Sequence, residues 1–531
     1  MPGTTATRSE WLIAKSEAVA TRGMVTADQP AAADAALDVL RDGGNAVDAA
    51  VTAAFAMGVA EPSTSGVGGV ACMVVRSVDG RETVIDGSST APLGATPDMF
   101  RIASGSQRAG MYGWPATVEN ESNVGYRSLG VPGMVAAMAL ALDRYGTIPL
   151  SRAIAPAIAL ARDGIEVDHY LALQLAGYAD RLWPIAESTR VFYKEGRLPP
   201  RPAMGLEPAD RLVQPDLARS LEAIAAGGPA ALYRGELARA IVDDVRAHGG
   251  LITLDEMAAY RAREREPLVT DYRGHRVATV PGCSGGITLV ELLDVLEGFP
   301  LGTLDRRSAR YVHLLAESER RAFADRLALL GDPDIVDAPF ARLASKEHAA
   351  AVRASIDAER ATVDLLPLAV AAADVAHTTH ISVVDERRMC VSLTATLGGG
   401  FGSGVVARGT GIVLANVMTW FDPRPGRPNS IAPGKRILWA PAPSVVSRDG
   451  APRLVVGAPG GRKLITAVLQ SILNVLDHGD APQEAVNGLR AHCEGPETWV
   501  DARMPAETRA QRAAMGHTVV VKEETLSSTW F

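Results

Sequence analysis

The chain has 531 residues, 47% of them hydrophobic and 21% charged, and a formal net charge of −8. This is the composition of an ordinary folded protein, and the lack of a basic footprint argues against nucleic acid as a partner. No apolar run approaches the roughly 18 residues of a membrane span, and residues 1–21 lack the apolar core of a secretory signal. We therefore expect a cytoplasmic protein that contacts no membrane. The four cysteines show neither CxxC nor CxH spacing, which argues against a disulfide scaffold and a zinc site.

The first 330 residues predict mainly helices. Pro30 and Asn45 are expected to begin two of them, over residues 30–40 and 46–58, with Gly43-Gly44 as the break between them. A glycine- and serine-rich turn at 61–69 leads into a strand over 71–76 and its hairpin partner at 83–86. The remaining pattern predicts one strand over 272–279 and helices over 134–145, 154–163, 217–226, 237–247, 287–297 and 308–330.

The last third of the chain follows a weakly patterned linker over 356–377. Short strands separated by Gly, Pro and Asp are predicted at 383–384, 389–397, 411–415, 442–447 and 454–457. Two helices follow, over 463–478 and 482–491. Helices, then strands, then helices, with antiparallel turn signals, indicate a layered α+β sandwich and not a βαβ series.

The segment His377-Thr378-Thr379-His380 suggests a reaction chemistry. A threonine hydroxyl is a poor nucleophile at neutral pH and needs an adjacent base. If the chain is cut just before the threonine, the freed α-amine is that base, with a reference pKa of about 7.7–8.0. With Thr378 in this role, the protein is a self-cleaving proenzyme that transfers acyl groups.

Other motifs allow competing hypotheses. The glycine clusters at 66–71 and 402–407 fit G-x-G-x-x-A, but neither is predicted to follow a strand and open a helix, as a dinucleotide site requires. His377, His380 and Asp385 suggest a metal site, yet residues 377 and 380 of a strand face opposite sides. Gly460-Gly461 lies between a predicted strand and helix, where unpaired amides form either an oxyanion hole or merely a tight turn.

A series of segments, in the same order along the chain, resembles a known family. They are Gly23-Met24-Val25, 43–50, 61–69, Val131-Pro132-Gly133, Ser284-Gly285-Gly286, Glu317 through Asp325-Arg326, Thr378-Thr379-His380, Phe401-Gly402-Ser403-Gly404, Pro433-Gly434-Lys435-Arg436 and Pro459-Gly460-Gly461. On these segments the chain resembles the γ-glutamyltranspeptidase family of N-terminal-nucleophile hydrolases along nearly its whole length.

The resemblance implies one four-layer αββα sandwich that is cut between His377 and Thr378. Residues 1–377 would form the large subunit and residues 378–531 the small subunit of a single domain. The resemblance also implies that Thr378 is the nucleophile, that Thr396 hydrogen-bonds it, and that Gly460 and Gly461 hold the oxyanion. It implies no cofactor and no metal.

Four positions depart from the family's glutamyl-binding pattern. Ser88 stands where γ-glutamyl enzymes carry an Arg, Gly398 where they carry an Asn, Trp420 in place of an acidic residue, and Trp439-Ala440 in place of a Ser-Ser pair. A charged head group needs charge-assisted partners, each worth about 1.5–3 kcal/mol. We therefore expect either a more apolar substrate pocket lined by Trp420 and Trp439, or that these tryptophans are simply core residues.

Two further features remain open on sequence grounds. Arg462 or Lys463 would either supply a substitute anion contact or, as is commoner at a helix start, be solvated. The chain ends at Phe531, earlier than typical members of the family, which leaves the last strand in doubt.

The predicted function is an autoprocessed amidohydrolase or acyltransferase that acts on a small amide or peptide-like molecule. One alternative is a genuine γ-glutamyl transferase or glutathione hydrolase, and another is a C–C bond hydrolase of a biosynthetic pathway. A non-catalytic binding protein with the same fold is a third alternative. Thr378, Thr396 and the glycine pair count against it, because binding alone does not require them.

Overall fold

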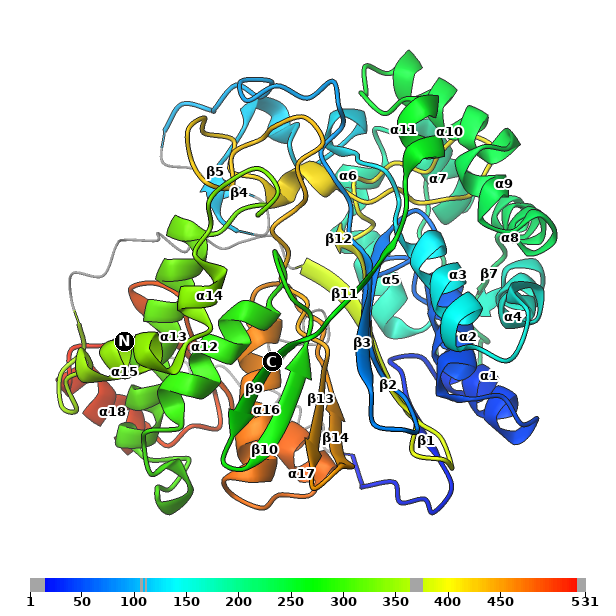
Figure 1. Ribbon diagram of the computed structural model, residues 1–531. Helices are drawn as coiled ribbons and strands as arrows, with labels where there is room; N and C mark the ends of the chain where they lie inside the picture. The colour runs from blue at the N-terminus through cyan, green and yellow to red at the C-terminus, as the bar shows by residue number, and fades with distance from the viewer. Residues whose placement is uncertain (1–14, 106–107, 110–111, 363–375, 523–531) are drawn as a thin grey trace.

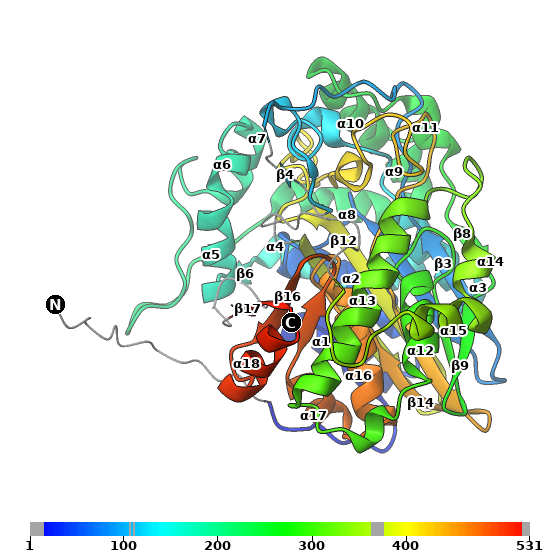
Figure 2. The ribbon, with the colours of Figure 1, turned by 90° about the vertical axis from the view of Figure 1, so that its left-hand side faces the viewer.

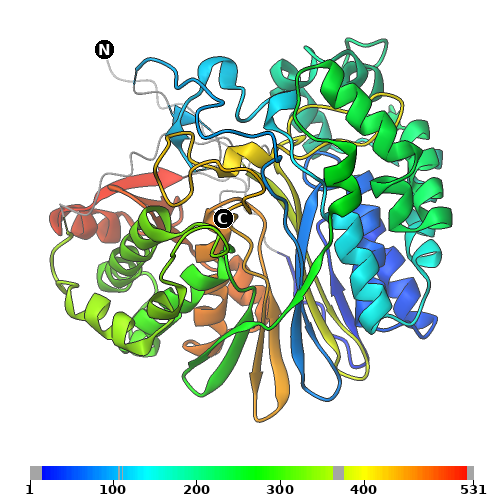
Figure 3. The same ribbon diagram turned by 45° about the horizontal axis from the view of Figure 1, so that its top comes forward.

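The computed structural model describes residues 15–105, 108–109, 112–362 and 376–522. Two β-sheets face each other in the middle of the molecule, and helices cover both outer faces (Figure 1). Figure 3 shows the two sheets side by side between the helical layers. The chain is therefore a four-layer αββα sandwich, as the sequence predicts.

The first sheet has six strands and the second has four, with antiparallel neighbours throughout. Both sheets combine strands from before and after the His377–Thr378 bond, so neither part of the chain alone supplies a complete sheet. In spatial order, the first sheet is β1 (Met24–Thr26), β11 (Ala376–Val384), β12 (Cys390–Gly399), β2 (Val70–Arg76), β3 (Glu82–Gly87) and β8 (Arg263–Arg265). The second is β14 (Ala451–Val456), β13 (Ser444–Arg448), β10 (His275–Thr279) and β9 (Leu268–Tyr272).

The helical layer over the first sheet is built around α2 (Ala46–Ala60), which packs on β11 and β12. Asn45 begins this helix as predicted: its side chain accepts hydrogen bonds from the amides of Val47 and Asp48, at 2.9 and 3.0 Å. Apart from Gly58, every residue of α2 is buried, because neighbouring helices cover its outer side. The neighbours are α1 (Pro30–Arg41), α3 (Met134–Tyr145) and α4 (Leu150–Asp163), and α8 (Pro215–Gly227) packs in turn on α4.

The opposite layer contains α12 (Gly286–Leu296), α13 (Ala309–Leu329), α15 (Lys346–Ala354) and α16 (Lys463–Leu476). Figure 2 shows the C-terminal segments, drawn in red, gathered beside α13. They form a small sheet of β15 (Ala491–Cys493), β16 (Glu497–Asp501) and β17 (Thr518–Lys522), with α18 (Ala506–Ala514). Among the described residues, none of the helices is both long and apolar enough to cross a membrane.

The other elements are short or lie at the periphery. They are α5 (His169–Gly177), α6 (Ala179–Leu182), α7 (Ala186–Phe192), α9 (Pro229–Tyr233), α10 (Glu236–Ala247), α11 (Leu254–Ala259), α14 (Phe340–Leu343), α17 (Pro482–Asn487), the 3-10 turns Val118–Asn120, Tyr126–Ser128, Leu301–Thr303 and Val417–Trp420, and the two-residue strands β4 (Arg108–Ala109), β5 (Trp114–Pro115), β6 (Ile165–Glu166) and β7 (Arg211–Leu212).

Several predicted boundaries are wrong. The single strand expected over 272–279 is the hairpin β9–β10, because Arg273 and Gly274 take left-handed φ values of 49° and 74° and turn the chain. The strand expected at 411–415 is a loop in which only isolated bridges form. The helix expected to reach residue 491 ends at Asn487, and the elements after it were not predicted. Of the predicted linker, 363–375 lies outside the described residues, and its end belongs to β11.

Candidate active site

Thr378 lies in β11 at an irregularity of the first sheet. His377 pairs with Gly398 and Thr379 pairs with Ala395, so the single residue Thr378 faces two residues of β12. One of these two is Thr396. A β-bulge of this kind aims side chains away from the regular ladder and is common beside active sites. Thr378 is nevertheless well enclosed, with 5% of its surface exposed.

The hydroxyl of Thr396 connects the groups around the predicted cut. Thr378 Oγ1 donates to Thr396 Oγ1 at 3.1 Å, and Thr396 Oγ1 donates in turn to the carbonyl oxygen of His377 at 2.7 Å. The amide of Gly398 donates to the same Thr396 oxygen at 2.9 Å. One donated and two accepted hydrogen bonds use the full capacity of a hydroxyl. The structure thus brings the predicted Thr378–Thr396 pair together, on the carbonyl group that precedes Thr378.

His377 and His380 face different parts of the molecule, as the strand geometry predicts. The ring of His377 lies 2.8 Å from the hydroxyl of Tyr178 and 3.2 Å from that of Tyr170, beside α5. The ring of His380 faces the second sheet, where a Cβ built on Gly457 would lie only 2.1 Å from it. The two imidazoles therefore do not share a metal site.

His380 lies on the same face of β11 as Thr378, two residues away. Its ring nitrogens lie 3.0 Å from the hydroxyls of Thr394 and Ser382. Complete burial lowers the pKa of His380 to about 3, because the charged imidazolium is disfavoured away from water. His380 is therefore neutral at physiological pH and is a very weak base.

Two carboxyl groups lie behind the other face of the strand. The hydroxyl of Thr379 donates to Oδ2 of Asp28, an exposed residue, at 3.0 Å. Glu61, the residue after α2, is 5% exposed, and burial first and Asp28 second raise its pKa to about 9. Glu61 is thus protonated at neutral pH. Sequence reasoning gave no role to either carboxyl group.

The predicted oxyanion turn follows β14 in the second sheet. The hydroxyl of Ser382 donates to the carbonyl of Val455 at 3.4 Å, and His380 packs on Gly457. Pro459 and Gly460 lie two and three residues beyond Gly457, past the end of β14 at Val456. Gly460 and Gly461 have φ values of 110° and 66°. Among the described residues, neither of their amides donates a hydrogen bond to another protein group, which suits an oxyanion hole.

Arg462 follows the turn and is buried, not solvated. Its Nη2 lies 2.8 Å from Glu494 Oε1, and only 6% and 3% of the two side chains are exposed. The guanidinium also lies over the ring of Tyr112, 5.7 Å from its centroid. Burial lowers the pKa of the adjacent Lys463 to about 8. Glu494 was missed because it belongs to the unpredicted β15 region, and an ion pair across 32 positions leaves no periodic signal.

The residues at the positions that depart from the family's glutamyl-binding pattern form hydrogen bonds with other protein groups. The hydroxyl of Ser88 accepts from Arg436 Nη1 at 3.3 Å, and its carbonyl accepts from Tyr260 at 2.7 Å. The backbone of Trp439 bonds to Cys283 and to Arg326, at 2.9 and 2.6 Å. All four of Ser88, Trp420, Trp439 and Ala440 are buried.

We refer to Ser88, Trp420, Trp439 and Ala440 as the wall residues. Gly398 lies between one of them, Trp420, and the nucleophile. Its φ of 96° lies in the region that favours glycine. A Cβ built here would lie 2.1 Å from Asn416 Oδ1 and 3.3 Å from Cη2 of Trp420. The Trp420 indole therefore lies against the residue whose amide donates to Thr396. The absence of a side chain at Gly398 and the large side chain at Trp420 fit each other.

The four-layer αββα sandwich and the matches to solved structures place the chain among the N-terminal-nucleophile hydrolases, and the chain is an enzyme of this class. The γ-glutamyltranspeptidase family model matches residues 32–530, and the chain belongs to this family.

Curated relatives carry two kinds of name. The glutathione hydrolase proenzyme of Escherichia coli K12 is 38% identical over 520 residues, which cover 95% of this chain and 87% of the relative. The acylase ACY 1 proenzyme of Pseudomonas sp. V22 is 39% identical over 510 residues, which cover 95% and 88%.

Solved structures divide in the same way. Cephalosporin acylase from Bacillus halodurans matches with a TM-score of 0.84 and 27% identity, over 99% of this chain and 94% of that one. Helicobacter pylori γ-glutamyltranspeptidase matches with a TM-score of 0.59 and 33% identity, over 66% and 95%. The comparisons establish the family and leave the acyl group open.

Proposed function

We propose that the enzyme is made as one precursor, cuts itself between His377 and Thr378, and then uses Thr378 as an N-terminal nucleophile on an acyl amide. Residues 1–377 and 378–531 are the large and small subunits. They stay together as one domain, because each sheet contains strands from both. The substrate is a small amide or peptide-like molecule whose acyl group is not a γ-glutamyl group with a free ammonium and a free carboxylate.

The observation that carries the proposal is the pair of hydrogen bonds made by Thr396. In self-cleavage, Thr378 Oγ1 adds to the carbonyl carbon of His377, the C–N bond breaks, and the nitrogen takes the hydroxyl proton. Water then hydrolyses the resulting ester and leaves a His377 carboxylate and a free α-amine. The Thr396 hydroxyl, 2.7 Å from the His377 oxygen, donates to that oxygen as negative charge develops on it.

After the cut, the new α-amine is the best available base for the Thr378 hydroxyl. Its reference pKa of about 7.7–8.0 suits general-base catalysis near neutral pH. His380 is the titratable side chain on the same strand face, and its pKa of about 3 makes it too weak a base. This contrast supports a nucleophile that provides its own base.

In turnover, the deprotonated hydroxyl attacks the substrate carbonyl and forms an acyl ester on Thr378. The Gly460 and Gly461 amides stabilise the oxyanion, and the leaving amine takes the proton. Water then releases the acyl group as an acid, or an acceptor amine takes it as a new amide.

The contacts of the departing residues support an apolar acyl group. A free γ-glutamyl head group carries an ammonium and a carboxylate, and each needs a charged partner. Trp420 brings an indole to the position of the acidic partner. Asp422, two residues further on, is held by Arg424 at 2.6 Å and is 3% exposed, so it does not replace that partner.

A second candidate function is a genuine γ-glutamyl transferase or glutathione hydrolase. The observation that favours it is the contact of Arg436 with Ser88, because it keeps a guanidinium near the position that lacks the family's arginine. Arg436 is half-buried and would supply a carboxylate contact from another direction.

Four anilides separate the two candidates. The γ-glutamyl, 4-aminobutanoyl, glutaryl and butanoyl anilides carry both charges, the ammonium alone, the carboxylate alone and neither. We expect kcat/KM for the glutaryl or butanoyl compound to equal or exceed that for the γ-glutamyl compound. A γ-glutamyl anilide at least 100 times better than both would establish the second candidate. A Thr378→Ala variant, inactive on all four, is the control for background hydrolysis.

A further inference from the structure

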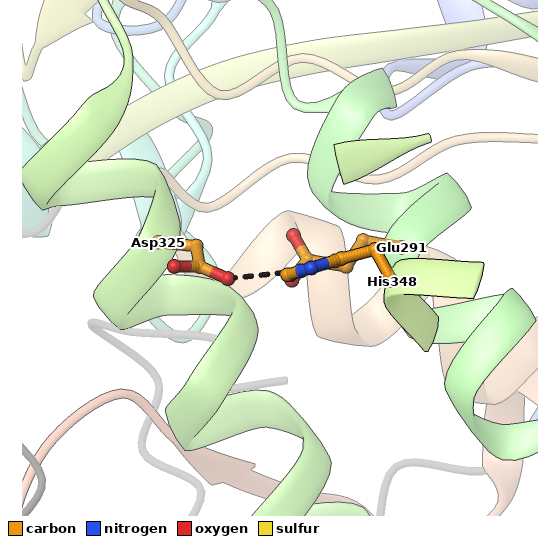
Figure 4. Close-up of side chains that lie close together, drawn as sticks. All are labelled: Glu291, Asp325 and His348. Atoms are coloured by element: carbon orange, nitrogen blue, oxygen red, sulfur yellow. Dashed lines mark hydrogen bonds and ion pairs between the residues drawn. The ribbon is translucent and has the colours of Figure 1, made fainter. Parts of the chain in front are cut away.

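Three side chains converge in the outer helical layer, apart from the acyl-transfer site. Glu291 comes from α12, Asp325 from α13 and His348 from α15 (Figure 4). His348 Nε2 lies 3.2 Å from Glu291 Oε1 and 3.1 Å from Asp325 Oδ2. These three atoms all lie within 4.8 Å of one another. Three separate helices therefore aim an imidazole nitrogen and two carboxylate oxygens at one point.

The imidazole of His348 offers fewer N–H hydrogens at this point than the two carboxylates offer acceptor oxygens. A ring nitrogen carries at most one hydrogen, and here two carboxylate oxygens compete for it. A hydrogen bond is strong only when the donor hydrogen points nearly straight at its acceptor. One N–H therefore serves at most one of these oxygens well. When both carboxyl groups are ionised, the cluster therefore has more acceptor oxygens than hydrogens to serve them.

The two distances from His348 Nε2 are compatible with a shared metal ion, and the two carboxylate oxygens lie within 4.8 Å of each other. Zinc bonds to imidazole nitrogen and carboxylate oxygen are about 2.0–2.2 Å long. Ligand atoms at right angles on such an ion are about 3.0 Å apart, and atoms at tetrahedral angles about 3.4 Å apart. The observed 3.1 and 3.2 Å fall between these two values.

The surroundings favour an added cation. Glu291 is 1% exposed, whereas 27% of the Asp325 side chain is open to solvent, which leaves a path for an ion and for water ligands. The neighbouring cationic side chains are engaged elsewhere. Lys346 bonds to Asp294 and Glu297, Arg353 to the carbonyls of Asp294 and Val295, and Arg326 to the carbonyls of Ser284 and Trp439.

We propose that Glu291, Asp325 and His348 form a binding site for a divalent transition-metal ion, with Zn²⁺ as the best match to the donor set. Water completes the coordination on the Asp325 side. The ion joins α15 to α12 and α13. Since α15 is the last helix before the predicted cut among the described residues, the site would hold this end of the large subunit in place. Its role is structural, because the three residues lie in the outer helical layer and Thr378 lies in the first sheet.

The test is calorimetric titration of the purified, chelator-treated enzyme with Zn²⁺. We expect one saturable equivalent, and at least tenfold weaker binding in the His348→Gln and Glu291→Gln variants. His248→Gln is the matched control, because His248 faces a single carboxylate, Asp244, at 3.4 Å on the surface. This control should bind Zn²⁺ like the wild type. Zn²⁺ should raise the melting temperature of the wild type and the control, but not that of the two variants.

Two results would overturn the proposal. One is the absence of a stoichiometric Zn²⁺ equivalent, and the other is unchanged affinity in both variants, which would leave the cluster a plain ion pair. Saturable binding of Ca²⁺ without Zn²⁺ binding would contradict the assigned ion class. If His348→Gln fails to fold, Asp325→Asn replaces it, because Asp325 is more exposed and its amide keeps the same shape.

Discussion

The nucleophile and the wall residues, of which Trp420 lies against Gly398, make different kinds of contact. Around Thr378, two hydroxyls, one carbonyl and one amide form a closed set of hydrogen bonds within 3.1 Å. Along the wall, Ser88, Trp420 and Trp439 are buried, and the hydrogen bonds described for them join them to other parts of the protein.

Under the proposed function, the residues around Thr378 carry out the reaction, and the wall residues determine which acyl group is accepted. The reaction depends on a few atoms whose positions the two strands fix, so a small change there should remove activity. The wall depends on side chains that fill space. Under the proposed function, changes there should alter which acyl group is accepted.

The largest effect is expected from Thr396→Val. Valine keeps the branched shape but loses the hydroxyl that donates to the His377 carbonyl. Loss of one oxyanion donor typically reduces rates about 10²–10³-fold. Self-cleavage, followed on a denaturing gel, and turnover should both fall by about this factor. Thr394→Val is the control, because Thr394 is a buried threonine of the same strand whose hydroxyl lies 3.0 Å from the His380 ring and not at the His377 carbonyl; this variant should cleave at a rate within a few-fold of wild type.

Alanine substitutions at Gly398 and at Gly409 test how tightly the protein is packed between the nucleophile and the wall residues. Gly398→Ala places a Cβ 2.1 Å from Asn416 Oδ1, whereas Gly409→Ala, also at a positive φ, meets nothing within 4 Å. The left-handed conformation alone costs about 1–2 kcal/mol, and overpacking adds about 1–3 kcal/mol. Both substitutions are made in the Thr378→Ala variant, which should remain uncleaved. Urea unfolding should show that Gly398→Ala is less stable than Gly409→Ala by the cost of overpacking, about 1–3 kcal/mol. Equal losses would mean that the protein is not tightly packed at Gly398.

Acid should weaken the nucleophile region through His380. Its pKa is about 6.5 in the unfolded chain and about 3 in the folded one, so only the unfolded chain binds this proton between these values. The stabilising contribution is therefore present above pH 6.5 and is lost as the pH falls toward 3, by about 1.4 kcal/mol per unit. His380→Gln should flatten the pH dependence of the free energy of unfolding by that slope.

The smallest effect is expected from Trp420→Phe. Phenylalanine keeps the wall apolar but is narrower, so the ranking of acyl groups by kcat/KM should change by up to about tenfold. The rate of self-cleavage should stay as it is. Trp183→Phe, at a side chain that is 54% exposed, is the control. A large loss of self-cleavage in Trp420→Phe would show that wall and nucleophile are not separable.

Local signals in the sequence were enough to predict much of the fold. Proline and asparagine caps placed the first two helices, and the order of the family's segments implied the sandwich. The hairpin at Arg273 was missed because arginine rarely adopts a positive φ. The apolar run 411–415 was taken for a strand, but Leu414 and Ala415 donate to Val405 and Gly68 in a loop, which only the tertiary structure determines.

The site was predictable where it rests on nearby or family-typical residues. The Thr378–Thr396 contact and the glycine turn followed from the resemblance. The Arg462–Glu494 pair and the Glu291–Asp325–His348 cluster did not, because each joins elements far apart in the chain and leaves no periodic pattern.

The most direct test of the account is N-terminal sequencing of the smaller fragment of freshly purified enzyme, together with its intact mass. The account predicts a fragment that begins Thr378-Thr379-His380 and is absent from the Thr378→Ala variant, which should remain one chain of 55.8 kDa. A single uncut wild-type chain that still turns over substrate, or a new terminus at another residue, would contradict it.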